Sequence, residues 1–474
     1  MNGDIKADIC VIGAGSGGLS VAAAASMMGA KTVLIESHKM GGDCLNYGCV
    51  PSKALIAASK AAHSMRHASR FGIRNHEPEV DFARVRDHVK GVVSEIEPND
   101  SVERFEGLGV EVILDQGRFS GPREVIAGDR HIRARRFVIA TGSSPSVPPI
   151  PGLADVPYLT NESIFDLENG PDHLIVIGGG AIGAELAQAH RRLGANVTII
   201  EMFKILGRND AEAANIVRTQ LIADGITIHE YTVVKCVEQN GACISVIIER
   251  AGKQLRIDGS HILVAAGRRA NLDGLNLETA GIQYSPKGID VDVRLRTTNK
   301  KIFAIGDIAS PYQFTHMAGY HAGIVIRNAL FKLPAKVNYD AVPWVIFTDP
   351  EVAHVGLTED QSREKFGNDL RVLRWRFAEN DRAQAERSIA GMIKVITSRR
   401  GRIRGASIVG LHAGELILPW VLATNTHGNI SKMANLIVPY PTLSDVTKRV
   451  AGTYFTKSLF SEHVKRIVRF LQHF

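Results

Sequence analysis

One motif occurs twice, and it constrains the fold of this chain more than any other feature. In each copy a short apolar run leads into a Gly-x-Gly-x-x-Gly loop, then a helix-like stretch and a second apolar run. Glu36 lies 23 residues after Gly13, and Glu201 lies 23 residues after Gly178. A strand, a glycine loop, a helix and an acid in this order are typical of a βαβ unit that binds a dinucleotide. The alternative is a generic βαβ unit with a glycine-rich turn.

Each residue type in the motif has a physical role in holding a dinucleotide. The first glycine makes a tight turn, the second lets a pyrophosphate approach the backbone, and the third lets the helix pack against the strand. The helix N-terminus stabilises the phosphates, and the acid accepts hydrogen bonds from ribose hydroxyls. Two such sites in one chain predict two cofactors that exchange a hydride. The candidate residues are Gly13, Gly15, Ser16, Gly17, Gly18 and Glu36 in the first copy, and Gly178, Gly180, Ile182, Gly183 and Glu201 in the second.

The acid of the second copy bears on the choice of nicotinamide cofactor. An acid at this position accepts a 2′-hydroxyl and repels a 2′-phosphate. Arginine is absent at Glu201 and at the next three positions, although Lys204 leaves NADP binding possible. The sequence therefore favours NAD(H) over NADP(H).

Two cysteines lie five positions apart, at Cys44 and Cys49, in the segment 41–53. In a regular helix this spacing separates the Cα atoms by about 8.6 Å, and a disulfide tolerates at most about 7 Å. The pair therefore either stays unbridged or interrupts the helix, and Gly48 could supply the interruption. Pro51 suits a first helical turn, so Cys49 is expected near a helix N-terminus, where a thiolate is stabilised. Two reduced core thiols and half of a metal site are the alternatives, and a metal site would need further ligands.

Cysteine usage and hydropathy exclude several classes of protein. Five cysteines in 474 residues are too few for a disulfide-stapled secreted scaffold. No run reaches 18 apolar residues, and the N-terminal segment has no signal-like apolar region, so a cytoplasmic, reducing setting is expected. A net charge of +7 is too small over this length to indicate nucleic acid. The remaining cysteines are expected to be packing residues: Cys10, Cys236 and Cys243.

With these motifs the chain resembles the pyridine nucleotide–disulfide oxidoreductases over nearly its whole length. The segments that carry the resemblance are 41–53, Ala140–Gly142, Ala266–Arg269, Thr298–Asp307, Phe347–Ala353 and Ala413–Leu416. The resemblance implies an α/β fold with two Rossmann-like domains, for FAD and NAD, and an α+β C-terminal dimerisation domain. The expected boundaries are 1–146 for the first part of the FAD domain, 147–272 for the NAD(P) domain, 273–336 for the second part of the FAD domain, and 337–474 for the dimerisation domain.

The resemblance also implies roles for individual residues. Electrons would pass from the nicotinamide to FAD and on to a Cys44–Cys49 disulfide. Cys49 would be the thiol against the flavin, Cys44 the thiol that meets substrate, and Lys53 would lie near the flavin and pair with Glu185. The further positions implied for FAD are Gly42, Asp43, Lys53, Gly117, Thr141, Gly142, Ser143, Gly306, Asp307 and His316, and those for NAD are Glu185 and Gly267.

The C-terminal signature departs from the usual family pattern. The family usually has His-Pro-Thr with a later Glu, in which the His carries a proton at the partner subunit's active site, so a homodimer is implied. Here Tyr440 replaces the His and Asp445 replaces the Glu. A tyrosine titrates near pH 10 and is mainly a proton donor, whereas histidine titrates near pH 6.5. Mercuric reductases also carry a tyrosine here, but this sequence has no cysteine after Cys243, and no N-terminal metal-binding extension is expected.

The expected function is that of a FAD-dependent NAD(P)H:disulfide oxidoreductase similar to dihydrolipoamide dehydrogenase. Its acceptor would be a small-molecule disulfide or a metal thiolate. The alternatives are a mercury(II) reductase, a diaphorase or quinone reductase with an idle cysteine pair, and a dimeric scaffold that keeps FAD for stability. No resident metal and no nucleic-acid partner is expected.

The last segment, 461–474, has an amphipathic pattern. Val464, Ile467, Val468 and Leu471 recur at helical spacing with basic residues between them. A basic amphipathic helix can lie on an anionic membrane surface. The preferred expectation is a terminal helix packed on its own domain with a solvated face.

Overall fold

The computed structural model describes residues 4–241 and 243–474, and its first unit is a mainly parallel sheet. This sheet has seven strands, in the order β3-β2-β1-β6-β5-β4, with β18 paired to β6. The apolar run Ile9–Ile12 is buried because both faces of the strand are covered. Ile9 and Val11 share a core with apolar residues of 19–25, and Cys10 and Ile12 share another with apolar residues of 275–282. Its elements are β1 (Ile5–Ile12), α1 (Ser16–Met27), β2 (Thr32–Glu36), β3 (Val110–Leu114), β4 (Gly117–Gly121), β5 (Glu124–Ala127), β6 (Arg130–Ile139) and β18 (Ile302–Ala304).

The second unit repeats the local topology of the first. Its four-stranded parallel sheet has the order β10-β9-β8-β14, and a three-stranded antiparallel sheet, β11-β12-β13, lies beside it. The second glycine loop joins β8 to α6, as the first joins β1 to α1. The elements are β8 (His173–Ile177), α6 (Ala181–Arg192), β9 (Asn196–Ile200), α7 (Ala211–Ala223), β10 (Thr227–His229), β11 (Val233–Asn240), β12 (Cys243–Arg250), β13 (Lys253–Gly259) and β14 (His261–Val264).

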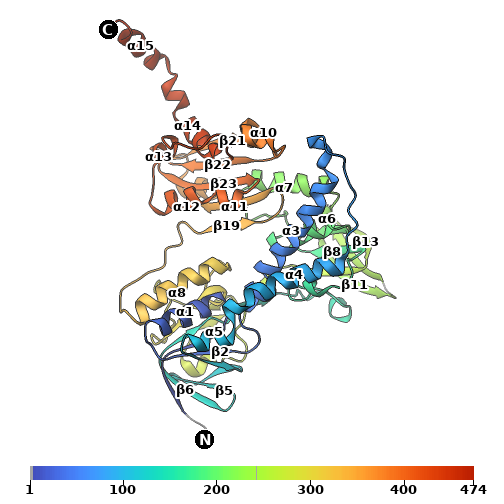
Figure 1. The fold of residues 1–474 in the computed structure, drawn as a ribbon, viewed down its shortest axis with the longest axis vertical. Helices are drawn as coiled ribbons and strands as arrows, with labels where there is room; N and C mark the ends of the chain where they lie inside the picture. Colours follow the sequence, from blue (N-terminus) through green and yellow to red (C-terminus); the bar gives the residue numbers. More distant parts are fainter. Residues whose placement is uncertain (1–3, 242) are drawn as a thin grey trace.

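The C-terminal unit is an antiparallel sheet covered by helices. The sheet has five strands in the order β19-β20-β23-β22-β21, and Trp420 and Phe377 are fully buried in its core. Figure 1 shows this unit at the opposite end of the molecule from the first sheet. Its elements are β19 (Pro343–Ile346), β20 (Glu351–Gly356), α9 (Glu359–Phe366), β21 (Arg371–Arg376), β22 (Met392–Thr397), β23 (Ile403–Gly410), α12 (Leu418–Asn425) and α14 (Asp445–Leu459).

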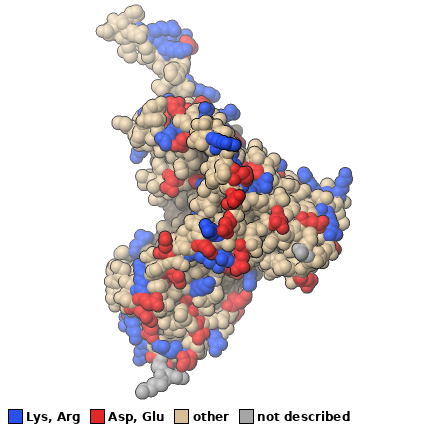
Figure 2. All heavy atoms as spheres, turned by 45° about the vertical axis from the view of Figure 1, so that its right-hand side comes forward, with Lys and Arg blue, Asp and Glu red and all other residues tan. Residues whose placement is uncertain are grey.

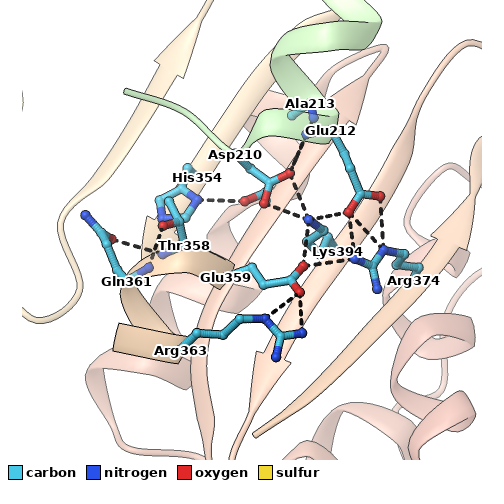
Figure 3. Close-up of polar contacts among 11 residues, drawn as sticks. Asp210, Glu212, Ala213, His354, Thr358, Glu359, Gln361, Arg363, Arg374 and Lys394 are labelled. Atoms are coloured by element: carbon cyan, nitrogen blue, oxygen red, sulfur yellow. Dashed lines mark hydrogen bonds and ion pairs between the residues drawn. The ribbon is translucent and has the colours of Figure 1, made fainter. Parts of the chain in front are cut away.

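An ion cluster joins the second unit to the C-terminal unit (Figure 3). Lys394 of β22 is buried, and its Nζ lies 2.8 Å from Asp210 Oδ2 and 3.0 Å from Glu359 Oε2. Glu212 of α7 also contacts Lys394, and Arg374 of β21 lies 2.9 Å from Glu359. The Asp210 side chain caps α7 through the amides of Glu212 and Ala213. The cluster therefore fixes the segment that leads from β9 into α7 against the C-terminal sheet.

The C-terminal helix corrects one sequence expectation. The segment forms α15 (Glu462–Leu471), as its spacing predicted, but none of the helix residues is buried. Figure 1 shows α15 extending beyond α14, away from the rest of the molecule. The expected packing of this helix on its own domain was therefore wrong, because an amphipathic pattern does not specify which surface covers the apolar face. Among the described residues, no helix is long and apolar enough to cross a bilayer.

Candidate active site

The glycines of the two loops are required by backbone geometry. Gly13 has φ +102°, and a Cβ there would lie 2.5 Å from the carbonyl oxygen of Ala140. A Cβ at Gly18 would overlap the carbonyl oxygen of Gly13, so the third glycine permits close packing of α1 on β1. Gly178, with φ +112°, and Gly183 repeat both constraints in the second loop. Both loops therefore have the shape that lets a phosphate approach the backbone.

The two acids are held in the same way. Glu36 accepts hydrogen bonds from the amides of Ala14, at 2.6 Å, and His38, at 2.8 Å. Glu201 accepts them from the amides of Gly179, at 2.7 Å, and Phe203, at 2.8 Å. Because a carboxylate has further lone pairs, each acid can still accept from ribose hydroxyls.

The structure contains a cavity that fits two dinucleotides. A connected cavity of about 2430 Å³ passes both loops. Among the described residues, no side chain caps α1 or α6, and neither first turn contains an acid, so both helix N-termini are suited to phosphate. A Cβ at Gly42 would lie 2.7 Å from Gly15 Cα, so this glycine is needed where the cysteine segment approaches the first loop. These features fit FAD in the first unit and a nicotinamide dinucleotide in the second.

Cys44 and Cys49 lie on two helices separated by a break. Cys44 is within α2 (Gly42–Asn46), and Cys49 begins α3 (Cys49–Arg66). The break falls at Tyr47 and Gly48, where a Cβ on Gly48 would lie 2.9 Å from the Asp43 carboxylate. Gly48 is thus required by this close approach rather than by a positive φ. Both thiols are free and line the cavity, as in the reduced form of a redox pair.

The surroundings make the two thiols unequal. A hydrogen bond from the Cys44 thiol, aided by Thr315 and the Lys53 charge, lowers the pKa of Cys49 to about 6 even though burial opposes it. The Thr315 Oγ1 atom lies 3.3 Å from Cys49 Sγ. The same contact with Cys49, together with burial, raises the pKa of Cys44. At neutral pH the pair is therefore a Cys49 thiolate beside a Cys44 thiol.

Lys53 is fixed next to this pair by contacts from two other units. Its Nζ lies 2.8 Å from Glu185 Oε2, on α6, and 4.3 Å from the centre of the Phe347 ring. The other oxygen of Glu185 accepts a hydrogen bond of 2.8 Å from the Phe347 amide. Glu185 is buried, whereas Lys53 keeps one side open to the cavity. The arrangement places a fixed positive charge beside the thiolate.

Asp307 belongs to a second polar group on the cavity wall. Ser143 Oγ donates to Asp307 Oδ2 at 2.6 Å, and Arg268 Nε donates to Ser143 Oγ at 2.8 Å. Arg268 also forms an ion pair of 3.2 Å with Asp43, to which Asn161 donates at 3.1 Å. Burial raises the pKa of Asp307. Arg268 thus connects three positions that were predicted to bind FAD, namely Asp43, Ser143 and Asp307.

The structure brings most of the predicted site residues to one cavity. Gly18 and Gly183 do not line it because they lie at the helix–strand contacts. The lining residues are Gly13, Gly15, Ser16, Gly17, Glu36, Gly42, Asp43, Cys44, Cys49, Lys53, Gly117, Thr141, Gly142, Ser143, Gly178, Gly180, Ile182, Glu185, Glu201, Gly267, Gly306, Asp307 and His316.

Tyr440 and Asp445 do not reach this cavity within one chain. Tyr440 is 70% exposed, and its hydroxyl donates to Asp381 Oδ2 at 2.7 Å. This hydrogen bond to a carboxylate raises the pKa of Tyr440, so the phenol stays protonated at neutral pH. Asp445 forms an ion pair of 2.8 Å with Arg449. Tyr440 lies on the surface of the C-terminal unit and Asp445 is partly exposed there, where a partner subunit could meet them.

Sequence reasoning missed four residues that contact or line the site. Thr315 contacts the thiolate and Phe347 contacts the lysine, both from distant segments, and Arg208 lines the cavity. Arg268 follows the predicted Gly267 in a segment that already carried the family resemblance. The segments containing Phe347 and Arg268 were therefore available as signals, and Thr315 directly precedes the predicted His316.

Comparison with known proteins agrees with this geometry. Residues 7–322 match the family described as pyridine nucleotide-disulphide oxidoreductase, and residues 342–451 match the dimerisation domain of that family. The chain belongs to this family. The matched dimerisation domain indicates a homodimer.

Individual members of the family are similar over nearly the whole chain. A mercuric reductase of Staphylococcus aureus is 34% identical over 96% of this chain and 83% of its own length. A dihydrolipoyl dehydrogenase of Thermus scotoductus is 36% identical over 92% of this chain and 95% of its own length. The structure of the HOCl-induced flavoprotein disulfide reductase RclA from Escherichia coli matches with a TM-score of 0.83 at 27% identity. That match covers 94% of this chain and 99% of the RclA chain.

These matches confirm the predicted fold class and the class of enzyme. The protein is a flavin-dependent disulfide oxidoreductase that uses NAD(P)H, with FAD and a redox-active disulfide. Its relatives of similar identity carry different names, so the family alone does not define the electron acceptor.

Proposed function

We propose that this enzyme uses NADH to reduce a small-molecule disulfide or a thiol-bound metal ion through FAD and the Cys44–Cys49 pair. When bound, FAD accepts a hydride from the nicotinamide and delivers an electron pair to the disulfide. The observation that supports the proposal most strongly is the Cys49 thiolate beside Lys53 on the wall of the cavity that passes both glycine loops.

The reduced cysteines would act in sequence on the acceptor. We assign Cys44 as the thiol that attacks a disulfide acceptor, which breaks the S–S bond, forms a mixed disulfide and releases the first thiol with the Cys44 proton. The Cys49 thiolate then attacks Cys44 Sγ, releases the second half of the acceptor as a thiolate and restores the Cys44–Cys49 disulfide. The hydrogen bond from Cys44 contributes most to the lowered pKa of Cys49, and Lys53 adds a positive charge beside the thiolate. Glu185 and Phe347 keep the lysine in place, so the charge is oriented before substrate arrives.

The preference for NADH rests on Glu201. Its carboxylate is fixed by two backbone amides at the mouth of the second loop, where a ribose 2′-oxygen is recognised in such units. A 2′-phosphate there would meet a fixed negative charge. Lys204 and Arg208 line the same cavity and would offset part of this repulsion.

Tyr440 supports a second candidate acceptor. In the homodimer, we propose that Tyr440 of one subunit completes the active site of its partner. Since its phenol is protonated at neutral pH, it can donate a proton or a hydrogen bond but does not collect the protons of a dithiol. A mercury(II) thiolate needs no base of this kind, which favours mercury(II) reduction as the alternative.

The acceptor and the role of the cysteines can be tested together. The FAD-loaded enzyme is assayed with NADH and one of four acceptors: lipoamide, glutathione disulfide, a mercury(II)–thiol adduct or a quinone. We expect turnover with a disulfide or with the mercury adduct, and loss of that turnover in Cys44→Ser. Quinone reduction should persist in the variant. Unchanged turnover of the preferred acceptor by Cys44→Ser would instead identify a diaphorase with an idle cysteine pair.

A further inference from the structure

Helix α15 has two chemically distinct faces. Lys465, Arg466 and Arg469 gather on one side, and Glu462 at the start of the helix is its one acid. Lys465 pairs with this acid at 2.8 Å, which leaves both arginines without a carboxylate from the helix. The apolar side is formed by Val464, Ile467, Val468 and Leu471, with Phe470 at its edge, and Phe474 follows the end of the helix.

The rest of the chain does not cover the apolar side. Phe470 is 62% exposed and Phe474 is 94% exposed, and Ile467 and Leu471 are exposed as well. The helix begins at Glu462, after Ser461, whose side chain caps it, and α14 ends shortly before at Leu459. Figure 2 shows basic residues grouped on this projecting end of the molecule. A contiguous apolar surface of this kind is unfavourable in water and marks a site of interaction.

The charge of the helix favours an anionic lipid surface over a second copy of the chain. Pairing two α15 helices through their apolar faces would cover the apolar side only, because both arginines of each copy lie on the other side of the helix and would stay without a carboxylate from it. At an anionic bilayer the apolar face enters the acyl boundary while the cations meet phosphate headgroups. We propose that α15 attaches the enzyme to the surface of an anionic lipid bilayer.

The proposal is independent of the acceptor and is consistent with the rest of the fold. The described part of the chain contains no helix that could span a bilayer, so the attachment is peripheral. The site cavity lies between the nucleotide-binding units and the C-terminal sheet and does not involve α15. Attachment therefore leaves the catalytic residues unchanged.

Vesicle co-sedimentation of the FAD-loaded, full-length enzyme tests the proposal. Vesicles of phosphatidylcholine alone are compared with vesicles that also contain phosphatidylglycerol, at about 0.1 M and about 1 M salt. We expect binding to the anionic vesicles that weakens at high salt, and little binding to neutral ones. Replacing the three cations by glutamine should weaken binding by about two orders of magnitude, at about fivefold for each charge.

Two further variants test whether vesicle binding depends on the apolar face of α15, or is weakened by an added negative charge at any exposed apolar position. Ile467→Asp combined with Leu471→Asp should abolish vesicle binding. Leu255→Asp, at an exposed leucine of β13, should not. The flavin spectrum and NADH-dependent quinone reduction report that each variant is folded.

Three results would overturn the proposal. The first is no binding of the parent enzyme to anionic vesicles, and the second is equal binding to neutral and anionic ones. The third is dissociation of the homodimer by Ile467→Asp with Leu471→Asp, measured by sedimentation velocity without lipid. That last result would show that the apolar face packs on the second subunit.

Discussion

Glu185 Oε2 lies 2.8 Å from Lys53 Nζ and thereby fixes a positive charge beside the redox cysteines. This ion pair joins α6, in the second nucleotide-binding unit, to α3, the helix that begins at Cys49. The second oxygen of Glu185 is held by the Phe347 amide, so the carboxylate cannot rotate away without losing a hydrogen bond. The buried Glu185 on α6 thus holds Lys53 of α3 and the backbone of Phe347 in fixed positions at the site.

Replacing this acid should slow catalysis without unfolding the protein. Glu185→Gln keeps the hydrogen bond from the Phe347 amide but removes the counter-charge of Lys53. Since hydrogen bonds to charged groups contribute about 1.5–3 kcal/mol, we expect flavin reduction by NADH to slow by about tenfold or more. Stopped-flow absorbance measures this rate. Glu111→Gln, which removes an acid paired with Arg130 on the first sheet, is the matched control and should leave the rate unchanged.

Replacing Glu201 should change the coenzyme preference, whereas replacing Glu36, the corresponding acid of the first unit, should not. Glu201→Gln removes the negative charge that a 2′-phosphate would meet, so the ratio of kcat/KM for NADPH to that for NADH should rise about tenfold. Glu36→Gln makes the same change in the first loop and should weaken FAD retention while leaving the ratio unchanged. An unchanged ratio in Glu201→Gln would assign the preference to other residues.

Tyr440 should matter as a proton donor. Tyr440→Phe removes the hydroxyl, and general acid catalysis contributes about a hundredfold or more, so reduction of a disulfide should fall strongly. Tyr440→His should gain dihydrolipoamide oxidation near neutral pH because histidine can accept a thiol proton there. Tyr454→Phe, which removes a surface hydroxyl of the same unit, is the control. Equal activity of Tyr440→Phe and the parent would exclude Tyr440 from the site.

The interdomain ion cluster predicts a particular pH dependence of stability. Hydrogen bonds with Arg374, aided by Lys394, lower the pKa of Glu212 to about 2. A carboxyl whose pKa is lower in the folded state stabilises the protein above its ordinary pKa of about 4.3. That contribution is lost as the pH falls towards 2.

Glu212→Gln tests this dependence. Because Glu212 is partly exposed, the variant should lose only about 1 kcal/mol of unfolding free energy at pH 7. The difference from the parent should shrink as the pH falls from about 4.3 towards 2. Denaturant unfolding at several pH values measures it, and a difference that grows in acid would contradict the assignment.

Local sequence was sufficient to predict the two nucleotide-binding units. The glycine loops, the acids and the break at Gly48 depend on residues close together in the chain, so their spacing carries the geometry. The contacts of Arg268 with Asp43 and of Phe347 with Lys53 join distant segments, and spacing holds no information about them. The position of α15 could not be predicted because amphipathicity identifies an apolar face without identifying its partner.

The most direct test of the account is an anaerobic NADH titration of the FAD-loaded enzyme, followed by its visible spectrum. We predict a long-wavelength band from the Cys49 thiolate against the flavin after two-electron reduction. Since the pKa of Cys49 is lowered to about 6, the band should be present at neutral pH and lost as the pH falls through about 6. In Cys44→Ser, which cannot form the disulfide, the band should already be present before NADH is added and should disappear when NADH reduces the flavin. It should be absent at every stage in Cys49→Ser. A flavin that bleaches without this band would contradict electron transfer through the cysteine pair.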